Sequence, residues 1–217
     1  MHEADKGVRV AVNVMRARLT VIGFNIAIVS FQLVQLYGLS GGIRVPGMNH
    51  PLHLMADIAL LMALALSLAA LVAFIMSCAL DEVGVCTHWS LITGDLLMYL
   101  GLAHTVAGFF APLDVAIDTL AANISAGTSE VAILRAALSI AGGVPWFLAT
   151  YAGPVVSLLR SPFPRRTNIA LGVAYLVLLI ALCWVNFQAI SLEAKGQIDE
   201  PGLIIGIIRG LVQPLWW

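Results

Sequence analysis

The sequence predicts an all-α fold, a polytopic integral membrane helical bundle of about five transmembrane helices with short interfacial helices. Of the 217 residues, 60% are hydrophobic and only 11% are charged, whereas an ordinary soluble domain has about 25% charged residues. Apolar runs of about 18 residues or more recur, and each is long enough to cross a hydrocarbon core about 30 Å thick. The runs are continuously apolar, and since the strands of a membrane β-barrel alternate in polarity, helices are expected.

Five membrane spans are expected within a single transmembrane domain, residues 1–217. They cover residues 19–38, 53–80, 90–111, 131–159 and 168–190, separated by loops rich in glycine, proline and charged residues. Two further segments have amphipathic or short apolar patterns and are expected to lie at the membrane interface, residues 112–125 and 202–217. The second of these is too short to span and ends in two tryptophans, which suit an interfacial anchor.

Basic residues predict the orientation. Four of them precede span one, and three lie between spans four and five; they are Lys6, Arg9, Arg16, Arg18, Arg160, Arg165 and Arg166. In a five-span protein these two groups lie on the same side of the membrane, and together they are most of the 11 lysines and arginines. The positive-inside rule therefore places the N-terminus in the cytoplasm and the C-terminus outside the cell (inner) membrane.

Four ionisable side chains are expected to form a polar cluster in the outer half of the membrane: Asp57, Arg135, His104 and His53. Ionisable groups inside spans are costly, which makes each a candidate functional residue. A lone guanidinium at that depth needs a carboxylate, and Asp57 is the only acid within a span on that side, so the two are predicted to pair. The alternative is that this pair only orients helices, and that His104 makes one hydrogen bond to a neighbouring carbonyl.

Span three carries a stripe of glycines at seven-residue intervals, Gly94, Gly101 and Gly108. Small residues at this spacing let two membrane helices approach closely. His104 lies one turn from two of the glycines and is therefore predicted to face a neighbouring helix. Asp95 lies on the opposite side of the same helix, toward the cytoplasmic end, and is expected to be solvated.

Span one has three polar side chains on one side, Asn25, Gln32 and Gln35. Such a stripe predicts hydrogen bonds between helices, within this chain or with another subunit. The alternative is that the stripe lines a pore.

Span four is interrupted by glycine and proline at two places. The residues expected to break or kink the helix are Gly142, Gly143, Pro145, Gly153 and Pro154. Each proline removes a backbone donor, so carbonyls one turn earlier, such as that of Thr150, need other partners. Irregular backbone in a membrane is tolerated where it is buried in protein or lines water, and transporters place substrates at such breaks. The alternative is an ordinary kink.

The first function that these features favour is that of a small channel or transport component. A polar cavity in the outer half, continuing past the broken span, would move protons or small ions, since a histidine beside a carboxylate suits proton transfer near neutral pH. Five short helices make a small bundle, so a pore predicts a homo-oligomer or other membrane subunits as partners, besides the lipid bilayer. A net charge of −1 gives no reason to expect nucleic acid.

The second function is that of a membrane-anchor or redox subunit of a respiratory-type complex. His53 and His104 would ligate one b-type haem, or a transition metal would bind among His50, His53, Asp57 and His104. The third is a non-catalytic scaffold subunit, favoured by the lack of any soluble domain. An enzyme is the least supported class, because the sequence has no HExxH, CxxC, GxSxG or Gly-rich phosphate loop.

Overall fold

A computed structural model describes residues 2–36, 38, 42–43, 51–79, 88–123, 128–193 and 203–212. Its elements are the helices α1 (His2–Leu36), α2 (Leu54–Ala79), α3 (Ser90–Asn123), α4 (Thr128–Phe147), η1 (Leu148–Ala152), α5 (Gly153–Leu159), α6 (Arg165–Glu193) and α7 (Leu203–Val212). Five stretches of helix are long and apolar enough to cross a membrane: Val14–Leu36, Leu54–Ser77, Ser90–Ile117, Ser129–Leu159 and Arg165–Glu193. The predicted all-α bundle is therefore confirmed.

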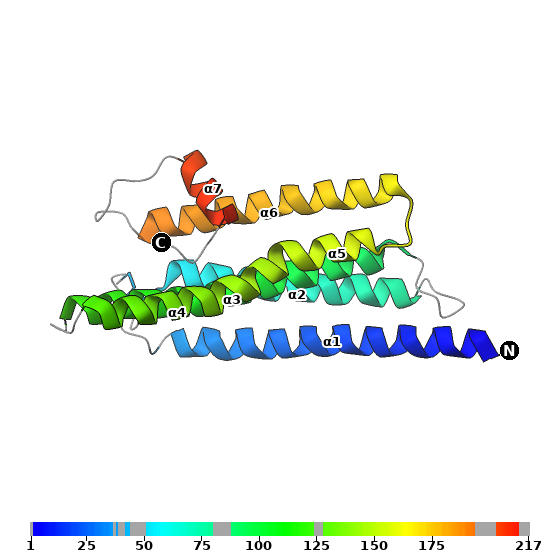
Figure 1. Ribbon diagram of the computed structural model, residues 1–217, viewed down its shortest axis with the longest axis horizontal. Coiled ribbons are helices and arrows are strands. Elements are labelled where there is room, and N and C mark those ends of the chain that lie inside the picture. Colours follow the sequence, from blue (N-terminus) through cyan, green and yellow to red (C-terminus); the bar gives the residue numbers. More distant parts are fainter. Residues whose placement is uncertain are drawn as a thin grey trace.

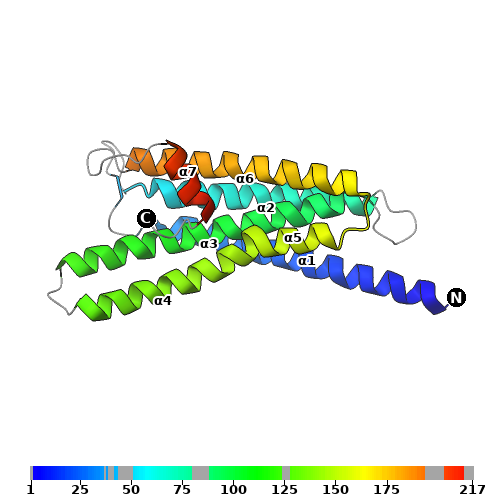
Figure 2. The ribbon, with the colours of Figure 1, turned by 45° about the horizontal axis from the view of Figure 1, so that its top comes forward.

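The long helices run side by side along the long axis and alternate in direction, whereas α7 crosses that axis (Figure 1). We call the end that carries the start of α1 and the turn between α5 and α6 the N-terminal end. We call the other end, where α2 and α4 begin and α6 stops, the far end. Figure 2 shows the hairpin of α3 and α4 projecting past α2 and α6 at the far end.

Helix α3 is the centre of the bundle, because it packs against α1, α2, α4, η1, α5 and α6. The glycine stripe faces α2, in agreement with the close helix approach that the sequence predicted. A Cβ atom added to Gly94 would lie 2.7 Å from the Phe74 ring, and one added to Gly108 would lie 2.7 Å from Leu60. At Gly101 it would lie 3.0 Å from the Ser67 hydroxyl. The two helices therefore approach too closely for side chains at these positions.

Replacing Gly101 by leucine is therefore expected to destabilise the bundle by about 1–3 kcal/mol, because an overpacked interface forces the two helices apart. Unfolding of the purified protein in detergent measures this. Gly23→Leu is the matched control, since a Cβ atom at Gly23 meets nothing within 4 Å. Equal stability losses in both variants would contradict the packing of α3 on α2.

The path of α3 differs from the expected one. A span ending at residue 111 and a separate interfacial helix over residues 112–125 were expected, but α3 continues through Pro112 to Asn123. Proline removes one backbone donor, and the apolar side chains after it keep their helical spacing, so the helix continues. The apolar helix expected within residues 202–217 is α7, and Trp216 and Trp217 lie outside the described residues.

Span four leaves α-helical structure at one of the two places where the sequence predicted a break or a kink. The α-helix runs through Pro145 and changes at Leu148 into a π-helical turn, η1, whose closing bond joins the Gly153 N–H to the Leu148 carbonyl. Pro154 follows at the start of α5. It cannot donate to the carbonyl of Thr150, which instead accepts a hydrogen bond from the Tyr175 hydroxyl of α6. The predicted need of this carbonyl for another partner is confirmed.

Candidate functional site

The contacts between α2 and α3 fix the relative depth of the predicted site residues. Gly101 lies opposite Ala63 and Ser67, and Gly108 lies opposite Ala56 and Leu60. In this register His53 is level with about residue 113 of α3. At 1.5 Å per residue, that is about 13 Å along the bundle axis from His104. By the same count Asp57 is about 8 Å from His104 along the axis.

Arg135 lies still farther out. Ala149 packs with Ala103, and Gly153 contacts the Tyr99 ring, so residue 135 is level with about residue 117 of α3. The side chain is exposed, about 20 Å along the axis from His104. The sequence suggested that Arg135 lies at about the depth of Asp57 and His104. It lies farther out because the α3–α4 hairpin extends past α2 and α6 at the far end. Pairing of Arg135 with Asp57, which lies in the first turn of α2, stays a prediction.

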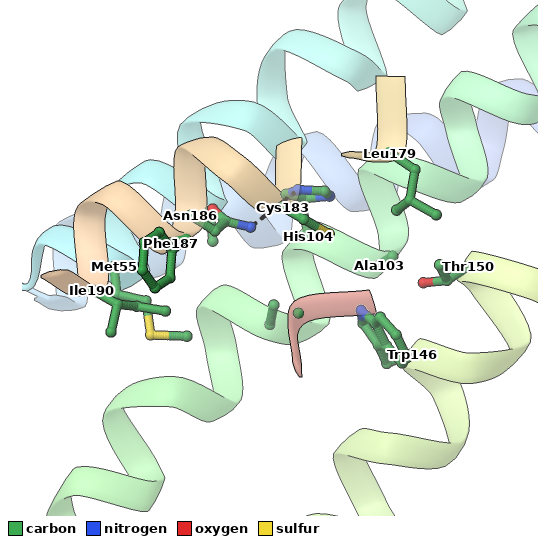
Figure 3. Close-up of a pocket in the computed structure, with 13 residues that line it drawn as sticks. Met55, Ala103, His104, Trp146, Thr150, Leu179, Cys183, Asn186, Phe187 and Ile190 are labelled. Atoms are coloured by element: carbon green, nitrogen blue, oxygen red, sulfur yellow. Dashed lines mark hydrogen bonds between the residues drawn. The ribbon is translucent and has the colours of Figure 1, made fainter. Parts of the chain in front are cut away.

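A cavity of about 30 Å³ lies beside His104 in the bundle. Side chains of α2, α3, α4, η1 and α6 and the backbone of α7 at Gly210 line it, and most of these groups are apolar (Figure 3). Its polar side chains are those of His104, Trp146 (through the indole N–H), Thr150, Cys183 and Asn186. Of the four residues of the predicted cluster, His104 alone is among the described residues that line this cavity.

His104 is buried, and the bond on one ring nitrogen fixes the role of the other. Nδ1 lies 2.9 Å from the carbonyl oxygen of Leu100. Since a carbonyl only accepts, Nδ1 carries the hydrogen of the neutral ring and Nε2 is an acceptor. The Asn186 Nδ2 group lies 3.5 Å from this atom and donates to it over a long bond. The alternative suggested by the sequence, one hydrogen bond from His104 to a neighbouring carbonyl, is therefore present, and the contact with Asn186 on α6 is additional.

Two further polar atoms lie beside the same cavity. Thr150 is fully buried. Neither its Oγ1 atom nor the Oδ1 atom of Asn186 has a hydrogen-bond partner among the described residues. Buried polar atoms are normally hydrogen-bonded. A cavity of this volume has room for one or two water molecules, which need two to four such partners each. The site therefore offers a hydroxyl and an amide oxygen to water or a small solute, and Nε2 of His104 can accept from water once the long bond from Asn186 is broken.

A partly buried ion pair between α1 and α3 was missed by sequence reasoning. Arg18 of α1 donates two hydrogen bonds to the carboxylate of Asp95 on α3, at 2.6 and 2.7 Å. The guanidinium carbon lies 5.7 Å from the centre of the Phe74 ring of α2, within range of a cation–π contact. Asp95 is only 3% exposed, so the expectation of a solvated acid was wrong.

The polar stripe on α1 acts partly as predicted. The Asn25 amide donates to the Ser67 hydroxyl of α2 at 2.9 Å, and that hydroxyl donates to the carbonyl of Ala63 at 2.8 Å. The interhelical hydrogen bond is therefore confirmed for Asn25. Gln35, at the end of the stripe, is exposed.

The arrangement does not suit the expected haem or metal. Two axial ligands of one haem iron must face each other across it, and His53 and His104 are separated by about 13 Å along the bundle axis. Within the described ranges, no three His, Cys, Asp or Glu side chains gather where they would hold a metal ion. His50, part of the predicted metal set, lies outside those ranges.

Comparison of the chain with protein-family models, with curated proteins and with solved structures found no match. The function must therefore be inferred from the site.

Proposed function

We propose that this multi-pass membrane protein is a transport component that moves protons through the cavity at His104. The observation that carries the proposal is the acceptor nitrogen Nε2 of a buried imidazole beside a cavity with room for water. Imidazole exchanges a proton more readily near neutral pH than other side chains do. Asn186 and Thr150 supply the polar atoms that would hold water in contact with it.

The lining favours protons over metal cations. A metal cation leaving water needs several oxygen ligands in place of its hydration shell. Among the described residues that line the cavity there is no carboxylate, and the oxygen atoms without partners are those of Thr150 and Asn186. A proton needs only one acceptor at a time, and His104 provides it. This set of polar groups therefore suits proton transfer through water better than dehydration of Na⁺ or K⁺.

The broken helix supports the same proposal. At η1 the backbone bonds shift, and the Tyr175 hydroxyl donates to the Thr150 carbonyl, so one further polar side chain lies next to the cavity-lining residue Thr150. The lining reaches Met55 and Ile190 near the far end. With the N-terminus in the cytoplasm, as the basic residues suggest, the cavity would open toward the outside.

A second candidate is a scaffold subunit of a membrane assembly. Only 11% of the most apolar window of the Ser129–Leu159 span is buried within this chain. That helix therefore offers a long apolar face to lipid, to a second copy or to another subunit. A subunit of this kind would carry no flux of its own.

Proton flux into vesicles distinguishes the two candidates. The purified chain is reconstituted with a pH-sensitive dye inside, and a pH step is applied while valinomycin and K⁺ clamp the membrane potential. Proton transport predicts that the pH gradient decays faster than in protein-free vesicles. The rate of this decay should not depend on whether the second cation of the buffer is Na⁺, choline or Cs⁺. Decay at the protein-free rate would favour the scaffold, and decay that follows the buffer cation would contradict proton selectivity.

A further inference from the structure

Helix α7 crosses the space between α6 and the α3–α4 hairpin, beside the cavity (Figures 1 and 2). Its Gly210 belongs to the cavity lining, and Figure 3 shows α7 passing close to Trp146 on that side. With ten residues, α7 is about 15 Å long, which is half of the length that a membrane span requires. Helix α7 is therefore too short to cross the membrane, and it packs against the bundle.

Two glycines let α7 lie flat on α6. A Cβ atom at Gly206 would overlap the Phe187 ring, and one at Gly210 would lie 3.5 Å from the Cβ atom of Cys183. Phe187 and Cys183 both line the cavity. The contact of α7 with α6 is therefore made at the cavity wall itself.

A polar contact joins α7 to the opposite wall. The Tyr151 hydroxyl, in the π-helical turn η1, donates to the carbonyl of Leu211. This carbonyl is among the last four of α7, which have no partner inside the helix. Helix α7 thus bridges α6 and η1 across the cavity. Its other face is exposed at Ile204, Ile205 and Ile208.

We infer that α7 is a plug that closes the cavity at His104, and that its release from η1 regulates proton movement. The inference rests on the proposed function, because it names the regulation of the same site. A ten-residue helix has little stability of its own. Helix α7 is therefore held in place by its contacts with α6 and η1, and the closed arrangement is reversed when these contacts break. Closure requires α7 to pack closely against α6, which explains why residues 206 and 210 are glycine.

A disulfide bond between α7 and α6 tests the plug. The ideal Cβ position at residue 210 lies 3.5 Å from the Cys183 Cβ atom, within the range of about 3.5–4.5 Å found in disulfides. The variant is Gly210→Cys in a background of Cys78→Ser and Cys86→Ser, so that Cys183 is its only partner. Oxidation should lock α7 and lower flux at least tenfold, and dithiothreitol should restore it. Gly210→Ser in the same background is the control and should not respond to oxidant.

A second variant tests release from the other wall. Tyr151→Phe removes the hydroxyl that binds Leu211 and keeps the ring, so flux is expected to rise several-fold. Flux by Tyr151→Phe that exceeds the flux of the unmodified chain several-fold would support a plug that is mostly closed at rest. If the Gly210→Cys variant forms no bond to Cys183, or if flux is unchanged after the bond has formed, the plug is overturned while proton transport stands. No flux in any variant, reduced or oxidised, would instead overturn the proposed function.

Discussion

Replacing Asp95 by asparagine is expected to lower the free energy of unfolding by about 3 kcal/mol, since it leaves the partly buried Arg18 guanidinium without its carboxylate. Arg18 makes both of its short bonds to this carboxylate, and the carboxylate is nearly fully buried between helices. Arg18→Gln should cost a similar amount. Denaturant-induced unfolding in detergent micelles measures both variants. Arg16→Gln is the matched control, because Arg16 lies two residues earlier on the same helix and is exposed.

The double variant separates the ion pair from other effects of the two substitutions. Arg18→Gln combined with Asp95→Asn leaves no stranded charge, so it is expected to recover much of the loss. Additive losses in the double variant would show that the two side chains do not interact. The pair would then have no role in joining α1 to α3.

Replacing His104 by glutamine is expected to lower proton flux at least tenfold and to leave the fold intact. Glutamine keeps a polar amide of similar size that can donate to the Leu100 carbonyl, but it has no group that takes up a proton near neutral pH. Flux is measured in vesicles under a pH step, and the unfolding transition of the same preparation reports the fold. Lost flux together with lost stability would assign His104 a packing role only.

The glycine stripe and Asn25 show what the sequence can predict in a membrane protein. Small residues at seven-residue spacing and an amide in an apolar span have few good environments, and both lie against a neighbouring helix, α2, as expected. Asp95 shows the limit. Its depth near one end of span three suggested solvation, but whether it meets Arg18 depends on the rotation of α1 against α3. That rotation is set by packing of many apolar side chains, which hydropathy does not encode.

The depth of Arg135 and the place of α7 could not be predicted for a related reason. A span beginning near residue 131 suggests that Arg135 lies within the outer half of the membrane, but the continuation of α3 beyond Pro112 moves the α3–α4 hairpin outward and the arginine with it. The prolines predicted a broken span four, yet the Thr150 carbonyl in its π-helical turn is satisfied by the Tyr175 hydroxyl from another helix. The packing of α7 against α6 is likewise a long-range contact, which no local sequence pattern specifies.

The most direct test of proton transfer at His104 compares two buried histidines in one vesicle preparation. His53 is buried to 6% exposure, much like His104 at 5%, but it does not line the cavity. Proton flux is measured for His104→Gln and His53→Gln at matched protein content. Proton transfer through the cavity predicts that His104→Gln falls toward the protein-free rate while His53→Gln keeps the rate of the unmodified chain. Equal flux in the two variants would contradict it.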